Sequence, residues 1–195
     1  MIQCVFVQFS KEDDKMVKDT ILVIDVDVDG IQEIMNILSD SYRICTAGSF
    51  EDALLIIRDI IPELILIDST MSAKDGFDIL EFLKTNDRSS HIPVIFITPL
   101  DNPDFEVRAF DMGSVDYITK PFVPKVVRKR IETQIKLAKY EHKLEELVEE
   151  KVSEIEDMYD IMAISFAGLV ESRDGITGGH LKNTAIYYKC FIDYL

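Results

Sequence analysis

Short apolar runs alternate with amphipathic stretches along most of this chain. The apolar runs are rich in β-branched residues and predict strands at Ile21–Ile24, Tyr42–Thr46, Leu64–Ile67, Val94–Ile97 and Val115–Ile118. The stretches between them predict helices, as in the helical spacing of Ile31, Ile34, Ile37 and Leu38, the S-x-x-D capping box of Ser49 and Asp52, and the segments 76–83 and 105–112. The alternation predicts an α/β fold with a five-stranded, parallel, doubly wound sheet.

Polar side chains follow four of the five predicted strands. Asp25 comes after the first strand, Asp68 after the third, Thr98 after the fourth and Lys120 after the fifth. A single polar residue at such a place is ordinary, because strands commonly end where the chain meets water. In doubly wound sheets, however, ligands bind outside the carboxyl ends of the strands, so four polar groups at one edge predict a site.

The chemistry of this set favours phosphoryl transfer. A pair of carboxylates can hold Mg²⁺, which prefers oxygen ligands, and a carboxylate can attack a phosphoryl donor. A phosphoryl group on Asp68 would then need positive charge and a hydrogen-bond donor nearby. Lys120 and Thr98 supply these two groups.

Residues from about Thr20 to Arg128 resemble the receiver domain of bacterial two-component response regulators, which has a flavodoxin-like fold. The resemblance lies in the acid after the first strand, "ILIDSTM" around Asp68, the hydroxyl of Thr98, the aromatic Tyr117 and "KPF" with Lys120. It implies that a sensor histidine kinase phosphorylates Asp68. It also implies that Thr98, Tyr117 and Lys120 bind the phosphoryl group or switch with it, and that the Lys120–Pro121 bond is cis.

The same resemblance implies a Mg²⁺ site at Asp25, Asp68 and the backbone of Thr70. Receivers usually carry a second acid directly after the first, whereas this chain has Val26. We therefore expect weak Mg²⁺ binding, with Asp27 or Asp29 as substitute ligands. The alternative is a degenerate receiver that acts as a dimerisation or docking module independent of phosphorylation.

A long helix is predicted after the receiver. Proline does not occur after Pro124, and glycine is next met at Gly168. Apolar residues recur every three or four positions at Leu137, Tyr140, Leu144, Val148, Val152, Ile155, Tyr159, Met162, Phe166 and Leu169. This spacing is typical of a coiled-coil seam with one stutter and predicts a parallel homodimer. The alternative is a helix packed back on its own domain.

The last segment resembles the start of an HD-GYP domain. Arg173, Asp174, Thr177, Gly178 and His180 match the order of that family's RD, TG and metal-binding histidine. The resemblance implies that His180 is a metal ligand in a complete output domain that hydrolyses cyclic di-GMP. No histidine follows His180, and metal-assisted hydrolysis needs several ligands. We therefore expect this chain alone to lack phosphodiesterase activity, which stays an open possibility for the full-length protein.

Charge and composition narrow the possible partners. The formal net charge of −15 argues against nucleic-acid or anionic-membrane partners, because either would repel such a surface. The three cysteines are far apart, and the apolar stretch at the N-terminus is too short for a signal peptide, so we expect a soluble, cytoplasmic protein. The expected division is a leader at 1–16, the receiver at 17–128, the coiled-coil helix at 129–164 and the HD-GYP fragment at 165–195.

Overall fold

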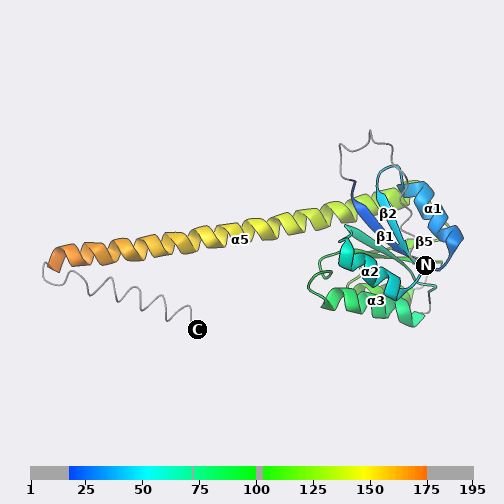
Figure 1. Cartoon of the computed structure of the whole chain (residues 1–195), viewed down its shortest axis with the longest axis horizontal. Coiled ribbons are helices and arrows are strands. Elements are labelled where there is room, and N and C mark those ends of the chain that lie inside the picture. Colours follow the sequence, from blue (N-terminus) through cyan, green and yellow to red (C-terminus); the bar gives the residue numbers. More distant parts are fainter. Residues whose placement is uncertain (1–17, 72, 100–102, 175–195) are drawn as a thin grey trace. The chain divides into compact units, whose positions relative to one another are not determined.

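The strands of the computed structural model form one parallel sheet in the order β2-β1-β3-β4-β5. Figure 1 shows this sheet with β1, β2 and β5 labelled. The structure describes residues 18–71, 73–99 and 103–174, and for 73–75, 103 and 170–174 it describes the backbone alone. The strands are β1 (Thr20–Ile24), β2 (Arg43–Ala47), β3 (Leu64–Asp68), β4 (Val94–Thr98) and β5 (Asp116–Thr119). The helices are α1 (Val28–Leu38), α2 (Phe50–Asp59), α3 (Ala73–Thr85), α4 (Pro103–Asp111) and α5 (Pro124–Asp174). The predicted five-stranded parallel fold is confirmed.

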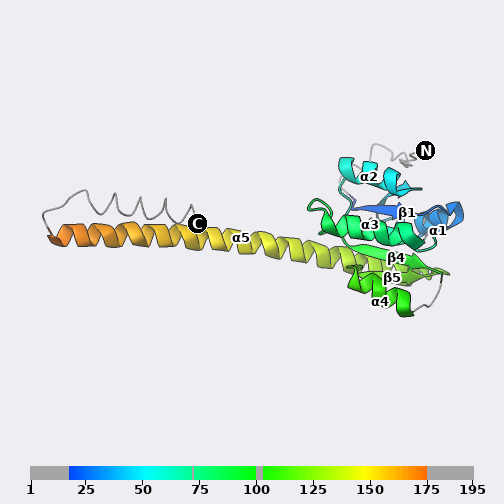
Figure 2. The same ribbon diagram turned by 90° about the horizontal axis from the view of Figure 1, so that it is seen from below.

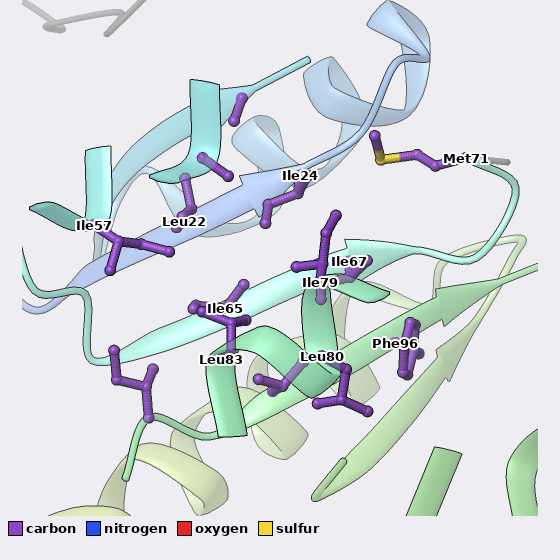
Figure 3. Packing of buried hydrophobic residues seen from close by; sticks show 14 of the residues in the cluster. Leu22, Ile24, Ile57, Ile65, Ile67, Met71, Ile79, Leu80, Leu83 and Phe96 are labelled. Atoms are coloured by element: carbon purple, nitrogen blue, oxygen red, sulfur yellow. The ribbon is translucent and has the colours of Figure 1, made fainter. Parts of the chain in front are cut away.

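Helices cover both faces of the sheet and form two apolar cores with it. Because successive strand residues point to opposite faces, Leu22 lies in one core and Val23 in the other. Figure 3 shows the first core, where Ile57 of α2 and Leu80 of α3 accompany Leu22. Figure 2 shows α2 and α3 beside the strands. The second core includes residues of α1 and of the first turns of α5.

Each of the described strands differs from its predicted range by one residue at one or both ends. β2 begins at Arg43, since the Tyr42 N–H donates to the carbonyl of Leu38 at 3.0 Å, in the turn after α1. At the other end of the sheet, Asp68 and Thr98 are the last residues of β3 and β4. Their backbones are thus paired within the sheet, which positions both side chains firmly.

Helix α5 is continuous over 51 residues. Among the described residues, the part of α5 up to Tyr140 belongs to one compact unit and the part from Glu141 onward belongs to a second. In the first unit Val127, Ile131 and Ile135 of α5 are buried in the second core, so the helix packs on the sheet beyond residue 128. The predicted long helix is confirmed. The leader and the segment around His180 lie outside the described residues.

Helix α5 is also the longest of the described helices. No helix in the described ranges has an apolar stretch long enough to cross a membrane.

Candidate functional site

The side-chain ammonium of Lys120 lies among three carboxylates at the carboxyl edge of the sheet. Its Nζ is 2.5 Å from Oδ2 of Asp68, 3.8 Å from Oδ2 of Asp25 and 3.9 Å from Oδ2 of Asp27. Asp68 ends β3, Asp25 follows β1, Asp27 precedes α1 and Lys120 follows β5. The parallel order of the sheet brings these distant residues together, as the sequence predicted for three of them.

Asp68 is fully buried and both of its oxygens are engaged. Oδ1 accepts hydrogen bonds from the backbone N–H and the hydroxyl of Thr70, both at 2.6 Å, and Oδ2 accepts from Lys120. Burial raises the pKa of Asp68, but the hydrogen bonds from Lys120 and Thr70 outweigh burial and hold that pKa below its ordinary value. Asp68 is therefore a fixed, ionised carboxylate.

Asp25 differs from Asp68 although both are buried. Its Oδ1 accepts a hydrogen bond from the backbone N–H of Asp27 at 2.8 Å. Burial, reinforced by the charge of Asp68, raises the pKa of Asp25 from 3.8 to about 6. For Lys120, burial lowers the pKa, but Asp68, Asp25 and Asp27 together raise it above its ordinary value. The ammonium of Lys120 is thus charged and balances part of the negative charge of the three aspartates.

The backbone of Lys120 extends the pairing of β5 with β4. The N–H of Lys120 donates to the carbonyl of Thr98 at 2.8 Å. The Lys120–Pro121 peptide bond is cis, as the resemblance implied.

Thr98 and Tyr117 occupy different positions relative to Asp68. Thr98 is buried, and it follows Ile97, which is paired with Asp68 in the ladder. Tyr117 lies on β5 and is half-buried, with its ring 6.1 Å from the ring of Phe110 in an edge-on arrangement. Tyr117 thus packs between β5 and α4, and Thr98 stands at the edge of the sheet beside the strand that ends in Asp68.

Two features of the site went unnoticed in the sequence. One is the hydroxyl of Thr70, which contacts Asp68 directly. The other is Gly30, where an added Cβ would lie 3.1 Å from Oδ2 of both Asp25 and Asp27 and 3.2 Å from Nζ of Lys120. The hydroxyl lies two residues after Asp68, a position that carries no signal by itself, because hydroxyls after an acid are common. The role of Gly30 depends on how α1 approaches the sheet, which no local pattern reveals.

The carboxylates of Asp25, Asp27 and Asp68 are of the kind that binds a hard divalent cation, although the ammonium of Lys120 now lies among them. Within the described residues no three His, Cys, Asp or Glu side chains are grouped so that they could hold a metal ion as they stand. The ammonium of Lys120 serves as a stand-in cation, since carboxylate oxygens are also the ligands that Mg²⁺ prefers. His180 lies outside the described residues.

Comparison with known proteins agrees with this geometry. The family model of the response regulator receiver domain matches residues 21–132. A probable cyclic di-GMP phosphodiesterase from Vibrio cholerae is 34% identical over 177 residues, which are 87% of this chain and 40% of that protein. The chain thus spans less than half the length of this relative.

Solved structures share the fold. NtrX from Brucella abortus is 29% identical, with a TM-score of 0.62 over 67% of this chain and 30% of the NtrX chain. The chemotaxis response regulator CheY4 of Vibrio cholerae is 20% identical, with a TM-score of 0.56 over 60% of this chain and 99% of its own, and shows the likeness of fold alone.

Proposed function

We propose, from the premise that the chain belongs to the receiver-domain family of response regulators, that Asp68 accepts a phosphoryl group from a sensor histidine kinase. The observation that carries this proposal is the position of Asp68. It is buried at the end of β3, held by Thr70 on one oxygen and by Lys120 at 2.5 Å on the other. An oriented, ionised carboxylate beside a fixed cation is suited to attack phosphorus.

The transfer exchanges one bond to phosphorus for another. An oxygen of Asp68 forms a bond to phosphorus while the bond from phosphorus to the kinase histidine breaks and the imidazole leaves. Lys120 is already at the acceptor and balances the charge that the phosphoryl oxygens bring. The buried hydroxyl of Thr98, at the edge of the neighbouring strand, is the proposed hydrogen-bond donor to the phosphoryl group, and Tyr117 is the proposed switch aromatic.

Mg²⁺ is the proposed cofactor of this step. Asp25, Asp68 and the backbone of Thr70 would hold it, and the bound ion would neutralise charge on the transferring oxygens. Binding is proposed to be weak, because Val26 stands where receivers usually have a second acid and its side chain is 59% exposed. Asp25 must be ionised to contribute.

Helix α5 is the proposed link to an output domain. Leu144, Val148 and Val152 are exposed along it, which supports a parallel homodimer in which this stripe forms the seam. In a parallel dimer, a change at Asp68 could reach the output domains as a shift or rotation of the paired helices.

The proposed output is hydrolysis of cyclic di-GMP by the whole protein. The 177-residue match to the Vibrio cholerae relative extends beyond the receiver at 21–132 and supports this assignment. His180 would then be one metal ligand of that domain.

A second candidate is a degenerate receiver that pairs or docks without phosphorylation. The observation that favours it is Val26 in the acidic pair. A receiver of this kind would take up no phosphoryl group even at high Mg²⁺ concentration, while its dimer through α5 would persist.

Phosphoryl uptake distinguishes the two candidates. The protein is incubated with a small phosphodonor and Mg²⁺, and its intact mass is measured. We expect a gain of one phosphoryl group, which Asp68→Asn abolishes and the exposed α3 control Asp78→Asn retains. No gain at any Mg²⁺ concentration, or a gain retained by Asp68→Asn, would exclude Asp68 as the acceptor.

A further inference from the structure

Position 26 cannot supply the carboxylate that the site lacks. Val26 is apolar and 59% exposed, whereas Asp25 beside it is buried. Two acids follow at positions 27 and 29, and the structure separates their roles.

Asp27 faces the site. Its Oδ2 lies 3.9 Å from Nζ of Lys120, nearly as close as the 3.8 Å of Asp25. The same carboxylate is the N-cap of α1 and accepts long hydrogen bonds from the backbone N–H groups of Asp29 at 3.2 Å and Gly30 at 3.3 Å. Asp29 itself is exposed, and its contribution is the backbone N–H that it donates to Asp27.

Gly30 keeps open the space between these groups. A Cβ at position 30 would be 3.1 Å from Oδ2 of Asp25, 3.1 Å from Oδ2 of Asp27 and 3.2 Å from Nζ of Lys120. Two carboxylate oxygens and an ammonium therefore border a small space that glycine leaves free. An alanine at position 30 would contact these three side-chain atoms more tightly than is usual, so they would have to shift by a few tenths of an ångström.

We propose that Asp27, reaching across the space over Gly30, provides the second carboxylate for the divalent cation in place of residue 26. This inference rests on the proposed function and names a residue of that same site. The ammonium of Lys120 already draws Oδ2 of Asp25, Asp27 and Asp68 to one centre of positive charge. Because Mg²⁺ keeps several water ligands, a carboxylate near that centre can stabilise the ion directly or through water.

The arrangement also supports the proposal that such a site would bind a cation weakly. The Asp27 carboxylate is shared between the first N–H groups of α1 and the cation, and it is 51% exposed. In addition, the carboxylates must give up part of their contact with Lys120 when a metal enters.

The experiment measures cation binding itself. Mn²⁺ is titrated into the full chain and free Mn²⁺ is followed by electron paramagnetic resonance, with Mg²⁺ as competitor. Asp27→Asn keeps the helix cap, because asparagine caps as well as aspartate, but it loses the charge. Asp29→Asn is the matched control, with the same change of charge one half-turn away on an exposed side chain.

We expect Asp27→Asn to weaken Mn²⁺ binding about tenfold, on the scale of one lost contact to a charged group, and Asp29→Asn to change it less than about twofold. Gly30→Ala should also weaken binding, and Val26→Asp should restore it in the Asp27→Asn background. Circular dichroism and thermal unfolding confirm that each variant is folded. Equal affinities for Asp27→Asn and Asp29→Asn would overturn the inference.

Phosphoryl uptake separates this inference from the proposed function. If Asp68 is phosphorylated but Mn²⁺ affinity does not depend on Asp27, the assignment of Asp27 as a ligand is wrong and the proposed function stands. If Mn²⁺ binding depends on Asp27 while Asp68 takes up no phosphoryl group, the cation site stands and the proposed function is wrong.

Discussion

Nζ of Lys120 lies 2.5 Å from Oδ2 of Asp68, and this pair joins residues that are 52 positions apart in the sequence. It links the end of β5 to the end of β3 across β4. Asp68 is fully buried, so its charge depends on this partner and on Thr70 for compensation. The pair is thus important both for the stability of the resting protein and for the proposed transfer.

Removing Lys120 should destabilise the metal-free protein and improve its affinity for a cation. Lys120→Ala leaves Asp68 buried without its cation, which we expect to lower the free energy of unfolding by roughly 3 kcal/mol. The same change removes the competing ammonium, so Mn²⁺ should bind more tightly. Urea unfolding and Mn²⁺ titration measure the two effects. Lys129→Ala, at an exposed lysine of α5, is the control and should change neither; equal behaviour of the two variants would contradict this account.

Asp25 should make stability depend on pH. Its pKa is raised from 3.8 to about 6, so between these values the folded protein retains a proton that the unfolded chain has released. The stability that this group contributes is full below about pH 3.8 and is lost as the pH rises through about 6. Asp68, whose pKa is lowered, acts in the opposite direction and at lower pH.

Urea unfolding in metal-free buffer over this range of pH measures the effect. In the wild type, the contribution of Asp25 to the free energy of unfolding should be lost as the pH rises through about 6. Asp25→Asn should lack that loss, and the exposed control Asp29→Asn should keep it. If the free energy of unfolding depended on pH in the same way in Asp25→Asn and in Asp29→Asn, a group other than Asp25 would be responsible for the pH dependence.

The sequence located the elements and most of the site because parallel βα units place strand ends at one edge. Asp25, Asp68 and Lys120 were found in this way. Asp27 was one of two candidate ligands, and the proposed choice of Asp27 over Asp29 depends on its distance of 3.9 Å from Lys120, which only three-dimensional geometry reveals. Gly30 went unnoticed because its importance is the space it leaves, and the Thr70 hydroxyl because hydroxyls after an acid are common.

Restoring the missing acid should strengthen metal binding. In Val26→Asp the side chain replaces an exposed valine, so the fold should be unaffected. We expect Mg²⁺ affinity to rise about tenfold, the scale of one additional contact to a charged group. Val28→Asp, at an exposed valine two positions further on, controls for added negative charge. No gain over the Val28 variant would mean that position 26 does not limit binding.

The exposed stripe of α5 should hold a dimer together. Leu144 is 60% and Val148 54% exposed, and their replacement by aspartate should place charge in the proposed seam. We expect light scattering to find a dimer for the wild type and a folded monomer for Leu144→Asp/Val148→Asp. Glu146→Asp/Glu150→Asp introduces aspartate in the same turns without a change of charge and should remain dimeric. A monomeric wild type at micromolar concentration would remove α5 from its proposed role.

The measurement that tests the central claim most directly is the location of the phosphoryl group. After phosphodonor treatment, borohydride reduction converts an aspartyl phosphate into homoserine, and peptide mass spectrometry then reads its position. The account predicts homoserine at residue 68, dependent on Mg²⁺ and absent from the untreated protein. Homoserine at Asp25 or Asp27 instead, or unmodified Asp68 in a folded protein at saturating Mg²⁺, would contradict it.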